Sequence, residues 1–203
     1  MKKSLIAFAA LGLSTACYAA EPGGYIGISL GQSTMDSGVS GVTGTGSLEE
    51  DGNPYKVYGG YNFGNNWSVE GSYINLGVVT TLSLNSGDTF NYEGITYITL
   101  VDGVRFELDG SVITLGAKYT AQLNNKFSVY GKASLASYSV DNTLTAPTGS
   151  STDNNSGTDI TVGIGASFAI NEELAAHLDY DTYGFEGGDT TVNIVSLGMS
   201  YAF

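Results

Sequence analysis

Hydrophobic and polar residues alternate along most of the chain after residue 24, with the period of two that is typical of β-strands. Each alternating segment is close to the roughly nine to eleven residues that a tilted membrane-spanning strand needs. Eight such segments cover residues 25–33, 54–63, a stretch that starts at Trp67, and residues 111–121, 127–140, 160–170, 174–183 and 191–203. No convincing run has a helical period, so the pattern predicts an all-β chain.

Every segment has one apolar face and one face of small, polar or charged residues, as Phe127 and Val129 beside Ser128 and Lys132 illustrate. In a soluble sandwich the apolar face packs on a core, whereas in a membrane barrel it faces lipid and the polar face lines the interior. Past residue 20 no apolar stretch is long enough for a membrane helix. Entry into a membrane therefore requires a closed barrel, which pairs every backbone N–H and C=O within lipid.

Three features favour the barrel over the sandwich. Connections alternate between short (64–66, 122–125, 171–173) and long (34–53, 77–109, 141–159, 184–190), the asymmetry of outer-membrane barrels. Glycine is abundant on the polar faces, where a narrow barrel is crowded. Aromatic residues flank the short turns and would form an interfacial girdle, namely Tyr61, Phe63, Trp67, Phe127, Phe168, Tyr201 and Phe203. We predict a transmembrane, antiparallel, up-and-down β-barrel of eight strands.

The first twenty residues have the features of a cleaved signal peptide. Lys2 and Lys3 precede an apolar run over 5–13, and small residues lead to a cut after Ala19 or Ala20. A membrane anchor needs about 18 apolar residues, so this run is too short. We therefore expect a signal peptide over 1–20 and a barrel over 21–203.

The single cysteine, Cys17, lies within the predicted leader, so the mature chain has no disulfide framework. A lipoprotein signal, the alternative that would acylate Cys17, usually carries a leucine that the preceding Ser14-Thr15-Ala16 lacks.

Without the leader, five Lys and Arg stand against 20 Asp and Glu, a formal charge near −15. So acidic a chain cannot bind nucleic acid through phosphate contacts. Fourteen of the acids lie in the long connections. We expect a solvated anionic surface beside lipopolysaccharide, with divalent cations bridging the two, or else loops that bind a host or surface ligand. A calcium-binding loop is a further alternative, although the spacing of the acids shows no EF-hand or RTX pattern. Residues 80–108 alternate around a turn at Asn85-Ser86-Gly87, which predicts a hairpin above the membrane with an edge for a partner strand.

The segment Ser196-Leu197-Gly198-Met199-Ser200-Tyr201-Ala202-Phe203 resembles the C-terminal signal of bacterial outer-membrane barrels. Ser196, Gly198, Tyr201 and Phe203 carry the resemblance, which implies recognition by the barrel-assembly machinery.

More broadly, the mature chain resembles the OmpA/OmpX-type family of eight-stranded barrels. The stretch from Trp67 to Gly77 is similar to that family's third strand, including an inward-facing Glu70. The chain departs from full-length OmpA by stopping at the barrel's end, so peptidoglycan binding is not implied.

Charged residues on the predicted inner faces form a layer near the middle of the lumen. An eight-stranded barrel is only wide enough to be filled by side chains, and charges buried there must pair. We expect an ion-pair plug, or alternatively a gate whose pairs exchange to admit small ions. Lys118 and Lys132 occupy nearly mirrored positions on one hairpin, so their like charges should repel unless a carboxylate lies between them. We predict that Glu70 is this carboxylate. The layer comprises Lys56, Glu70, Lys118, Lys132, His177, Asp179 and Asp181.

His177 is the only histidine, and with no Cys in the mature chain it cannot make a usual zinc site. We expect no cofactor, no metal and no enzyme activity. The leading function is a structural, envelope-integrity or adhesin-like role in the cell outer membrane through the acidic loops. The alternatives are a narrow porin-like channel and a lipid A-modifying enzyme, the latter disfavoured because His177 lies far from the outer leaflet.

Overall fold

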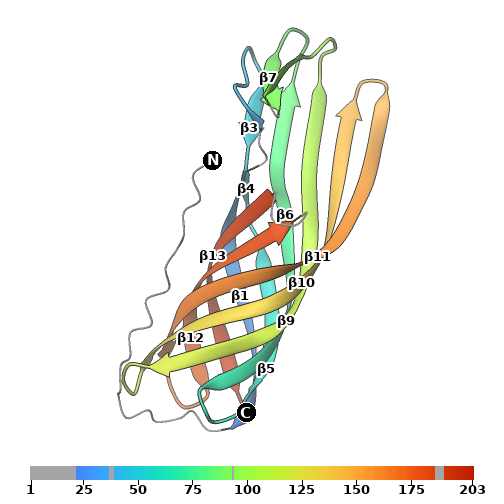
Figure 1. Cartoon of the computed structure of the whole chain (residues 1–203). Helices are drawn as coiled ribbons and strands as arrows, with labels where there is room; N and C mark the ends of the chain where they lie inside the picture. Colours follow the sequence, from blue (N-terminus) through green and yellow to red (C-terminus); the bar gives the residue numbers. More distant parts are fainter. Residues whose placement is uncertain (1–21, 37–38, 93, 186–189) are drawn as a thin grey trace.

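The computed structural model describes residues 22–36, 39–92, 94–185 and 190–203, and these ranges contain strands and no helix (Figure 1). The predicted signal peptide lies outside them. Within the described residues no helix is long and apolar enough to cross a membrane. The eight long strands are β1 (Gly23–Asp36), β5 (Tyr55–Asn62), β6 (Trp67–Leu84), β9 (Val104–Gln122), β10 (Phe127–Ala146), β11 (Gly149–Ala169), β12 (Leu174–Phe185) and β13 (Thr190–Ala202).

These strands form one closed antiparallel barrel. Each long strand pairs with the next in the chain, and β13 returns to pair with β1. Ile28 of β1, for example, lies opposite Val57 of β5 on one side and Met199 of β13 on the other. Closure removes the unpaired edges of an open sheet. The predicted eight-stranded up-and-down barrel is confirmed.

An asparagine side chain organises each of the three short turns. Asn62 Oδ1 accepts a hydrogen bond from the Gly64 N–H at 2.9 Å. Asn124 Oδ1 accepts from the N–H groups of Lys126 and Phe127, both at 2.9 Å. In the last turn, Asn171 Oδ1 accepts hydrogen bonds from the N–H groups of residues 173 and 174. Asparagine favours turns because its side chain bonds to backbone a few residues on.

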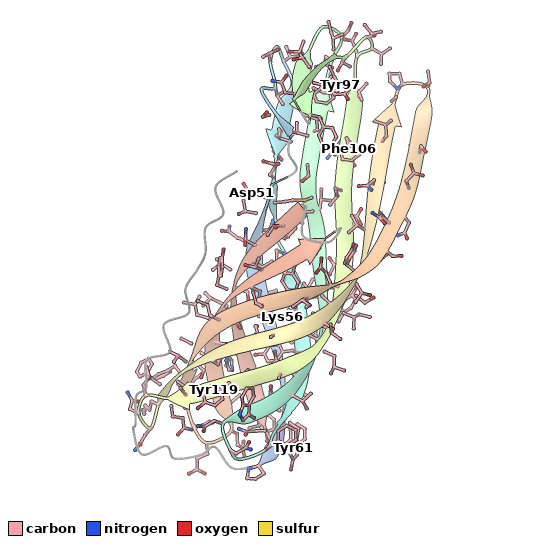
Figure 2. The ribbon with its side chains drawn as sticks, in the orientation of Figure 1. Asp51, Lys56, Tyr61, Tyr97, Phe106 and Tyr119 are labelled. Carbon is pink, nitrogen blue, oxygen red and sulfur yellow. The ribbon has the colours of Figure 1, made fainter. Side chains whose placement is uncertain are left out.

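The outward face of the barrel near these turns is apolar and exposed. On β9 the exposed residues Ile113, Leu115 and Tyr119 alternate with inward ones. Aromatic pairs gather at the short-turn end, where Figure 2 labels Tyr61 and Tyr119. We call this surface the apolar band; its exposed members include Ile26, Ile28, Leu30, Val57, Tyr61, Trp67, Val69, Ile113, Leu115, Phe127, Val129, Leu135, Ile160, Val162, Ile164, Leu178, Val195, Leu197 and Met199.

Four strands continue beyond the apolar band and rise well above the rest of the barrel (Figure 1). We call this part the upper wall: residues 78–84 of β6, 104–110 of β9, 137–146 of β10 and 149–159 of β11. Pairing holds to the ends, with Leu84 opposite Val104 and Ala146 opposite Gly149. The predicted hairpin over 80–108 is therefore confirmed at its base.

The expectation of a long loop over 141–159 is wrong. Instead, β10 and β11 pair without interruption through this region and leave only a two-residue turn. The segment is rich in Ser, Thr and Asn, whose polarity suggested a loop, but Thr suits a strand. Thr143 and Thr152 lie opposite each other, and their hydroxyl oxygens are 3.0 Å apart. Polar residues lie on both faces of this hairpin, and residues 149–156 are all exposed.

The apolar face of the strands reverses where the upper wall begins. On β9, Ile113 and Leu115 point outward, whereas Phe106 and Leu108 are partly buried and line the inside. Two β-bulges on β6 contribute to the change, since the register skips one residue between Asn75 and Gly77 and another between Val78 and Thr80. The skipped residues, Leu76 and Val79, are 1% and 0% exposed. Most apolar side chains of the upper wall therefore lie on its inner face, although Val78 and Leu144 stay exposed.

Five short strands complete the structure at the long-loop end. They are β2 (Val39–Ser40), β3 (Ser47–Glu49), β4 (Asp51–Gly52), β7 (Thr89–Tyr92) and β8 (Ile95–Ile98). β3 pairs with β6 and β4 with β1, so they widen the upper wall, while β2, β7 and β8 form a small separate sheet.

The interior has three levels. Polar and charged side chains fill the half nearer the short turns. Above them lies an apolar layer, and above that layer the upper wall encloses a cavity of about 590 Å³. The apolar layer includes Ile74, Val112, Ala136, Tyr183, Val192 and Ile194, all buried.

Candidate functional site: the lumen and the upper wall

The charged lumen residues come from five strands, and their lysines and carboxylates form two ion-pair clusters. Lys56 lies on β5, Glu70 on β6, Lys118 on β9 and Lys132 on β10, while β12 carries the two aspartates and the histidine. Figure 2 labels Lys56 inside the barrel, below Phe106 of the upper wall. A strand's period of two puts these side chains inward because their neighbours occupy the apolar band.

The larger cluster joins two lysines to two aspartates. Lys132 Nζ is 2.8 Å from Asp179 Oδ1 and 2.9 Å from Asp181 Oδ1. Lys56 Nζ is 3.1 Å from Asp181 Oδ2 and 3.9 Å from Asp179 Oδ1. Tyr130 donates its hydroxyl proton to Asp179 Oδ1 at 2.9 Å. Each charge therefore has an opposite charge and further hydrogen bonds, as buried charges require.

The smaller cluster joins Glu70 to Lys118. Lys118 Nζ lies 2.7 Å from Glu70 Oε2, and the Tyr25 hydroxyl donates to the same oxygen at 2.8 Å. The ammonium group also sits 4.2 Å from the centre of the Tyr25 ring, a cation–π contact.

Glycines on the strand between two partners make room for these contacts. Gly163 lies opposite both Lys132 and Asp181, and a Cβ there would collide with the Asp181 carboxylate and the Lys132 side chain. Gly60 in the same way lies between Tyr25 and Glu70. Glycine at these two positions therefore leaves room for a side-chain contact across the intervening strand.

Glu70 does not sit between the two lysines of the β9–β10 hairpin as we predicted. Lys118 and Lys132 do lie directly opposite each other. Only Lys118 makes an ion pair with Glu70, whereas Lys132 turns the other way to the β12 aspartates. Because Gly163 has no side chain, Lys132 can reach across its strand to the aspartates of β12. Each lysine therefore has its own carboxylate partner.

His177 lies in the lumen on the short-turn side of the aspartates. Its Nε2 is 2.6 Å from Ser200 Oγ, and its Nδ1 is 3.4 Å from the Tyr130 hydroxyl oxygen. The rings of Tyr58 and Tyr130 stand edge-on to it. Across the described ranges, no group of three or more His, Cys, Asp or Glu side chains is arranged to hold a metal ion.

Little space remains around the ion pairs. Two voids border them, one beside Lys56 and Asp181 and the other beside Glu70 and Lys132, and each measures about 10 Å³. A single water molecule needs about that much room. Side chains therefore fill the lumen at this level.

Three residues of the predicted assembly signal lie on β13, where it closes the barrel, and Phe203 follows the strand directly. Ser196 and Gly198 face inward opposite Gly31 and Ser29 of β1, and a Cβ on Gly198 would collide with β1. Tyr201 is exposed in the apolar band, and Phe203 exchanges backbone hydrogen bonds with Gly24.

Comparison with known proteins decides what kind of barrel this is. A family described as "Outer membrane protein beta-barrel domain" matches residues 4–203. The chain belongs to this family. This outer-membrane barrel lies in the Gram-negative cell envelope, and its apolar band is the lipid-facing surface. Short turns face the periplasm in such barrels and long connections face outward, so the upper wall is extracellular.

Solved structures share the fold of this outer-membrane barrel. Ail of Yersinia pestis, in a complex with the heparin analogue sucrose octasulfate, is 20% identical, with a TM-score of 0.54, covering 89% of this chain and 99% of its own. The N-terminal barrel of Pseudomonas aeruginosa OprF is 17% identical, with a TM-score of 0.54 and coverage of 90% and 100%. OprG of the same organism is 14% identical, with a TM-score of 0.54 and coverage of 92% and 99%. No curated protein matches the chain.

The outward face of the extracellular wall is acidic. Asp109 on β9 lies directly opposite Asp141 on β10, and Glu107 forms an ion pair with Arg105 at 2.8 Å. Partial burial raises the pKa of Asp109, and the charges of Asp141 and Glu107 raise it further. Asn154 of β11 donates to Asp141 at 2.7 Å. These outward residues form a band of negative charge just above the lipid.

Asp88 ties the extracellular segments together. Its Oδ1 accepts from the Thr45 N–H and its Oδ2 from the Asn85 N–H, both at 2.8 Å. The hydrogen bonds from the Asn85 and Thr45 backbone lower the pKa of this carboxyl. One side chain therefore fixes the chain after β2 to the turn that follows β6.

The predicted edge for a partner strand is located at β8. In the ranges that the structure covers, this strand pairs with β7 alone. All four of its residues are exposed, including Ile95 and Ile98. Nearby Leu100 is 80% exposed, so the tip of the extracellular part combines an unpaired strand edge with apolar side chains.

Proposed function

We propose that the protein is a non-enzymatic outer-membrane barrel with a structural and surface-interaction role, in which a filled barrel holds up an extracellular wall. One observation carries the proposal: β6, β9, β10 and β11 continue past the lipid-facing band as a paired sheet, and apolar side chains of β6, β9 and β10 line its inner side. A barrel that only needed to span the membrane would have no use for strands of up to 21 residues.

The charge on the wall supports the kind of contact we propose. Glu107, Asp109 and Asp141 face outward directly above the lipid band. Lipopolysaccharide is itself anionic there, so divalent cations would have to bridge its phosphates to these carboxylates. Contacts of this kind would strengthen the envelope around the barrel.

The filled lumen argues against the channel alternative. Three lysines and three carboxylates pair inside the barrel, and an apolar layer covers them. An ion would have to break buried pairs and then cross apolar side chains, each at a cost of several kcal/mol. We therefore place the function outside the barrel.

The ligand in the Ail structure does not suit this chain. Sucrose octasulfate is a polyanion, whereas the outward face of this wall carries Glu107, Asp109 and Asp141 against Arg105. Repulsion at short range would oppose a polyanionic ligand. A cationic or cation-bridged partner is the better match.

Shortening the wall tests the proposal. Residues 141–154 are replaced by Asn-Gly, which forms a two-residue hairpin turn and joins the facing residues Val140 and Asn155. Purified protein in phospholipid nanodiscs is then titrated with lipopolysaccharide, with and without Mg²⁺. We expect Mg²⁺-dependent binding by the intact barrel and at least about tenfold weaker binding by the shortened one.

Two controls give the result its meaning. Heat-modifiable mobility on gels shows whether the shortened barrel assembles, and a Thr143→Ala, Thr152→Ala variant alters the same hairpin without removing charge. Equal binding by the intact and shortened barrels contradicts the proposal, as does a steady ionic current through the intact barrel in a planar bilayer.

A further inference from the structure

The cavity inside the upper wall is separate from the ion pairs and from the acidic outer face. Its volume of about 590 Å³ falls within the roughly 300–1,000 Å³ that is usual for small-molecule sites. Side chains from β6, β7, β9, β10 and β11 line it, with single contributions from β1, β2 and β13. The apolar layer below forms its floor.

Most of the lining is apolar, because in the upper wall the apolar side chains occupy the inward positions of the strands. Leu82 and Leu84 of β6 face Phe106 and Leu108 of β9 around the cavity, and Val140 of β10 extends the same surface. Because this part of the molecule lies above the lipid-facing band, these side chains do not contact lipid, and Leu108 and Val140 pack against the apolar layer that forms the floor. Such a surface favours an apolar ligand body.

Polar groups gather on one wall of the cavity. Asn142 of β10 lies directly opposite Asp153 of β11, and Asn155 lies two residues along on the same face. Asp153 is exposed, which puts its carboxylate at the solvent side of the cavity. Among the described lining residues Asp153 is the one carboxylate, and no Lys, Arg or His is present.

We propose that this cavity binds an amphiphilic amine, with its apolar body against the leucines and phenylalanine and its cationic head at Asp153. The charge pattern decides the class of head group. An anionic head would face Asp153 without a cationic partner in the lining, whereas an ammonium group gains a charge-assisted hydrogen bond. This site is independent of lipopolysaccharide binding, since it uses the inner face of the wall.

Two methionines allow a direct measurement. The chain has three in all, with Met1 in the predicted leader. Met35 lines the cavity, while Met199 faces lipid. In nanodiscs, ¹³C-methyl-methionine NMR therefore separates cavity binding from partition into the bilayer.

The probes are decylamine, decanol and decanoate, which share a ten-carbon body and differ in the head group. We expect decylamine to shift the Met35 methyl signal saturably without a parallel shift of Met199. Decanoate should bind at least about tenfold more weakly, because a hydrogen bond to a charged group exceeds the 1.4 kcal/mol of a factor of ten.

Matched variants test the two halves of the site. Asp153→Asn should abolish the preference for the amine over the alcohol, while Glu107→Gln, on the outer face, should leave it unchanged. Val140→Trp should block all three probes, while Thr143→Trp, three residues along and outward, should not. If Val140→Trp does not assemble, Asp153→Asn carries the test alone.

Three results would overturn the proposal. One is a Met35 signal that no probe shifts. Another is equal binding of amine, alcohol and carboxylate by the native protein. The third is a shift of Met35 that always accompanies one of Met199, which would mean partition into lipid only.

Discussion

Lys132 on β10 pairs with Asp181 on β12 across Gly163 of the intervening strand, which lies opposite both. The contact crosses a whole strand because Gly163 has no side chain. Contacts of this form, in which a glycine separates the partners, set which charges meet in the lumen. The pairing cannot be read from any one strand by itself.

Filling that gap should destabilise the barrel. Gly163→Ala places a Cβ against the Asp181 carboxylate and the Lys132 side chain, and overpacking of this kind costs about 1–3 kcal/mol. Urea unfolding in lipid vesicles, followed by gel mobility, measures the loss. Gly131→Ala is the control, since a Cβ there has only one distant neighbour, at 4.0 Å; equal losses in both variants would contradict the role of the gap.

Glu70 should matter through its charge rather than its size. Glu70→Gln leaves the Lys118 ammonium buried without its carboxylate, a loss of about 3–5 kcal/mol when a buried pair is broken. The double variant Glu70→Gln, Lys118→Met removes both charges and should recover most of that stability. A double variant as unstable as the single one would show that the pair is not the cause.

Asp88 should make the extracellular segments sensitive to acid. Its folded pKa is lowered by hydrogen bonds from the Asn85 and Thr45 backbone, so its contribution is complete above the unfolded value of about 3.9. The contribution falls as pH drops through the folded pKa. The protection factors of the Thr45 and Asn85 amides, which correct for the pH dependence of the intrinsic exchange rate, should therefore fall below about pH 4. Asp88→Asn should exchange fast already at pH 7, and unchanged protection in this variant would refute the clamp.

Ionised Asp109 should destabilise the extracellular wall, whereas ionised Asp88 stabilises the extracellular segments. Burial, Asp141 and Glu107 raise its folded pKa, so its ionised form disfavours the folded wall at neutral pH, and this cost disappears as pH falls to the unfolded value. Asp109→Asn should slow exchange of the wall amides at pH 7 but not at pH 3.5. A gain that persists at the lower pH would mean that charge repulsion is not the source.

Much of the barrel follows from residue patterns. Alternation with outward Ile and Leu, as in Ile113 and Leu115, defines a lipid-facing strand, and turns built on Asn124 or Asn171 end it. The same seven residues that alternation turns inward do line the lumen. Their partners were harder to predict, because Lys132 could reach β9, β6 or β12 until the position of Gly163 between two strands was known.

The upper wall could have been predicted from the positions of apolar residues along β9, although the many polar residues of this region suggested loops. Past Ile113, toward the long loop, apolar residues on β9 occur at even positions, at Leu108 and Phe106, instead of odd ones. A change of phase without a turn means that the strand continues while its surroundings change from lipid to water. On β6 the bulged residues Leu76 and Val79 obscure the phase, and the cavity depends on strands that meet only in three dimensions.

The reversal of the strand faces at the membrane boundary is the centre of the account, and β10 offers the sharpest test. Cys17, the one native cysteine, lies in the predicted leader, so single cysteines can carry spin labels at outward positions 135, 137 and 143 and at inward position 138, where Tyr138 is buried. In liposomes, oxygen should relax the label at 135, and a water-soluble nickel chelate should relax those at 137 and 143 with strand-like mobility. The label at 138 should be shielded from the chelate compared with 137. Freely mobile labels at 137 and 138 with equal access to the chelate would contradict a paired wall, and lipid-like relaxation at 143 would contradict the boundary.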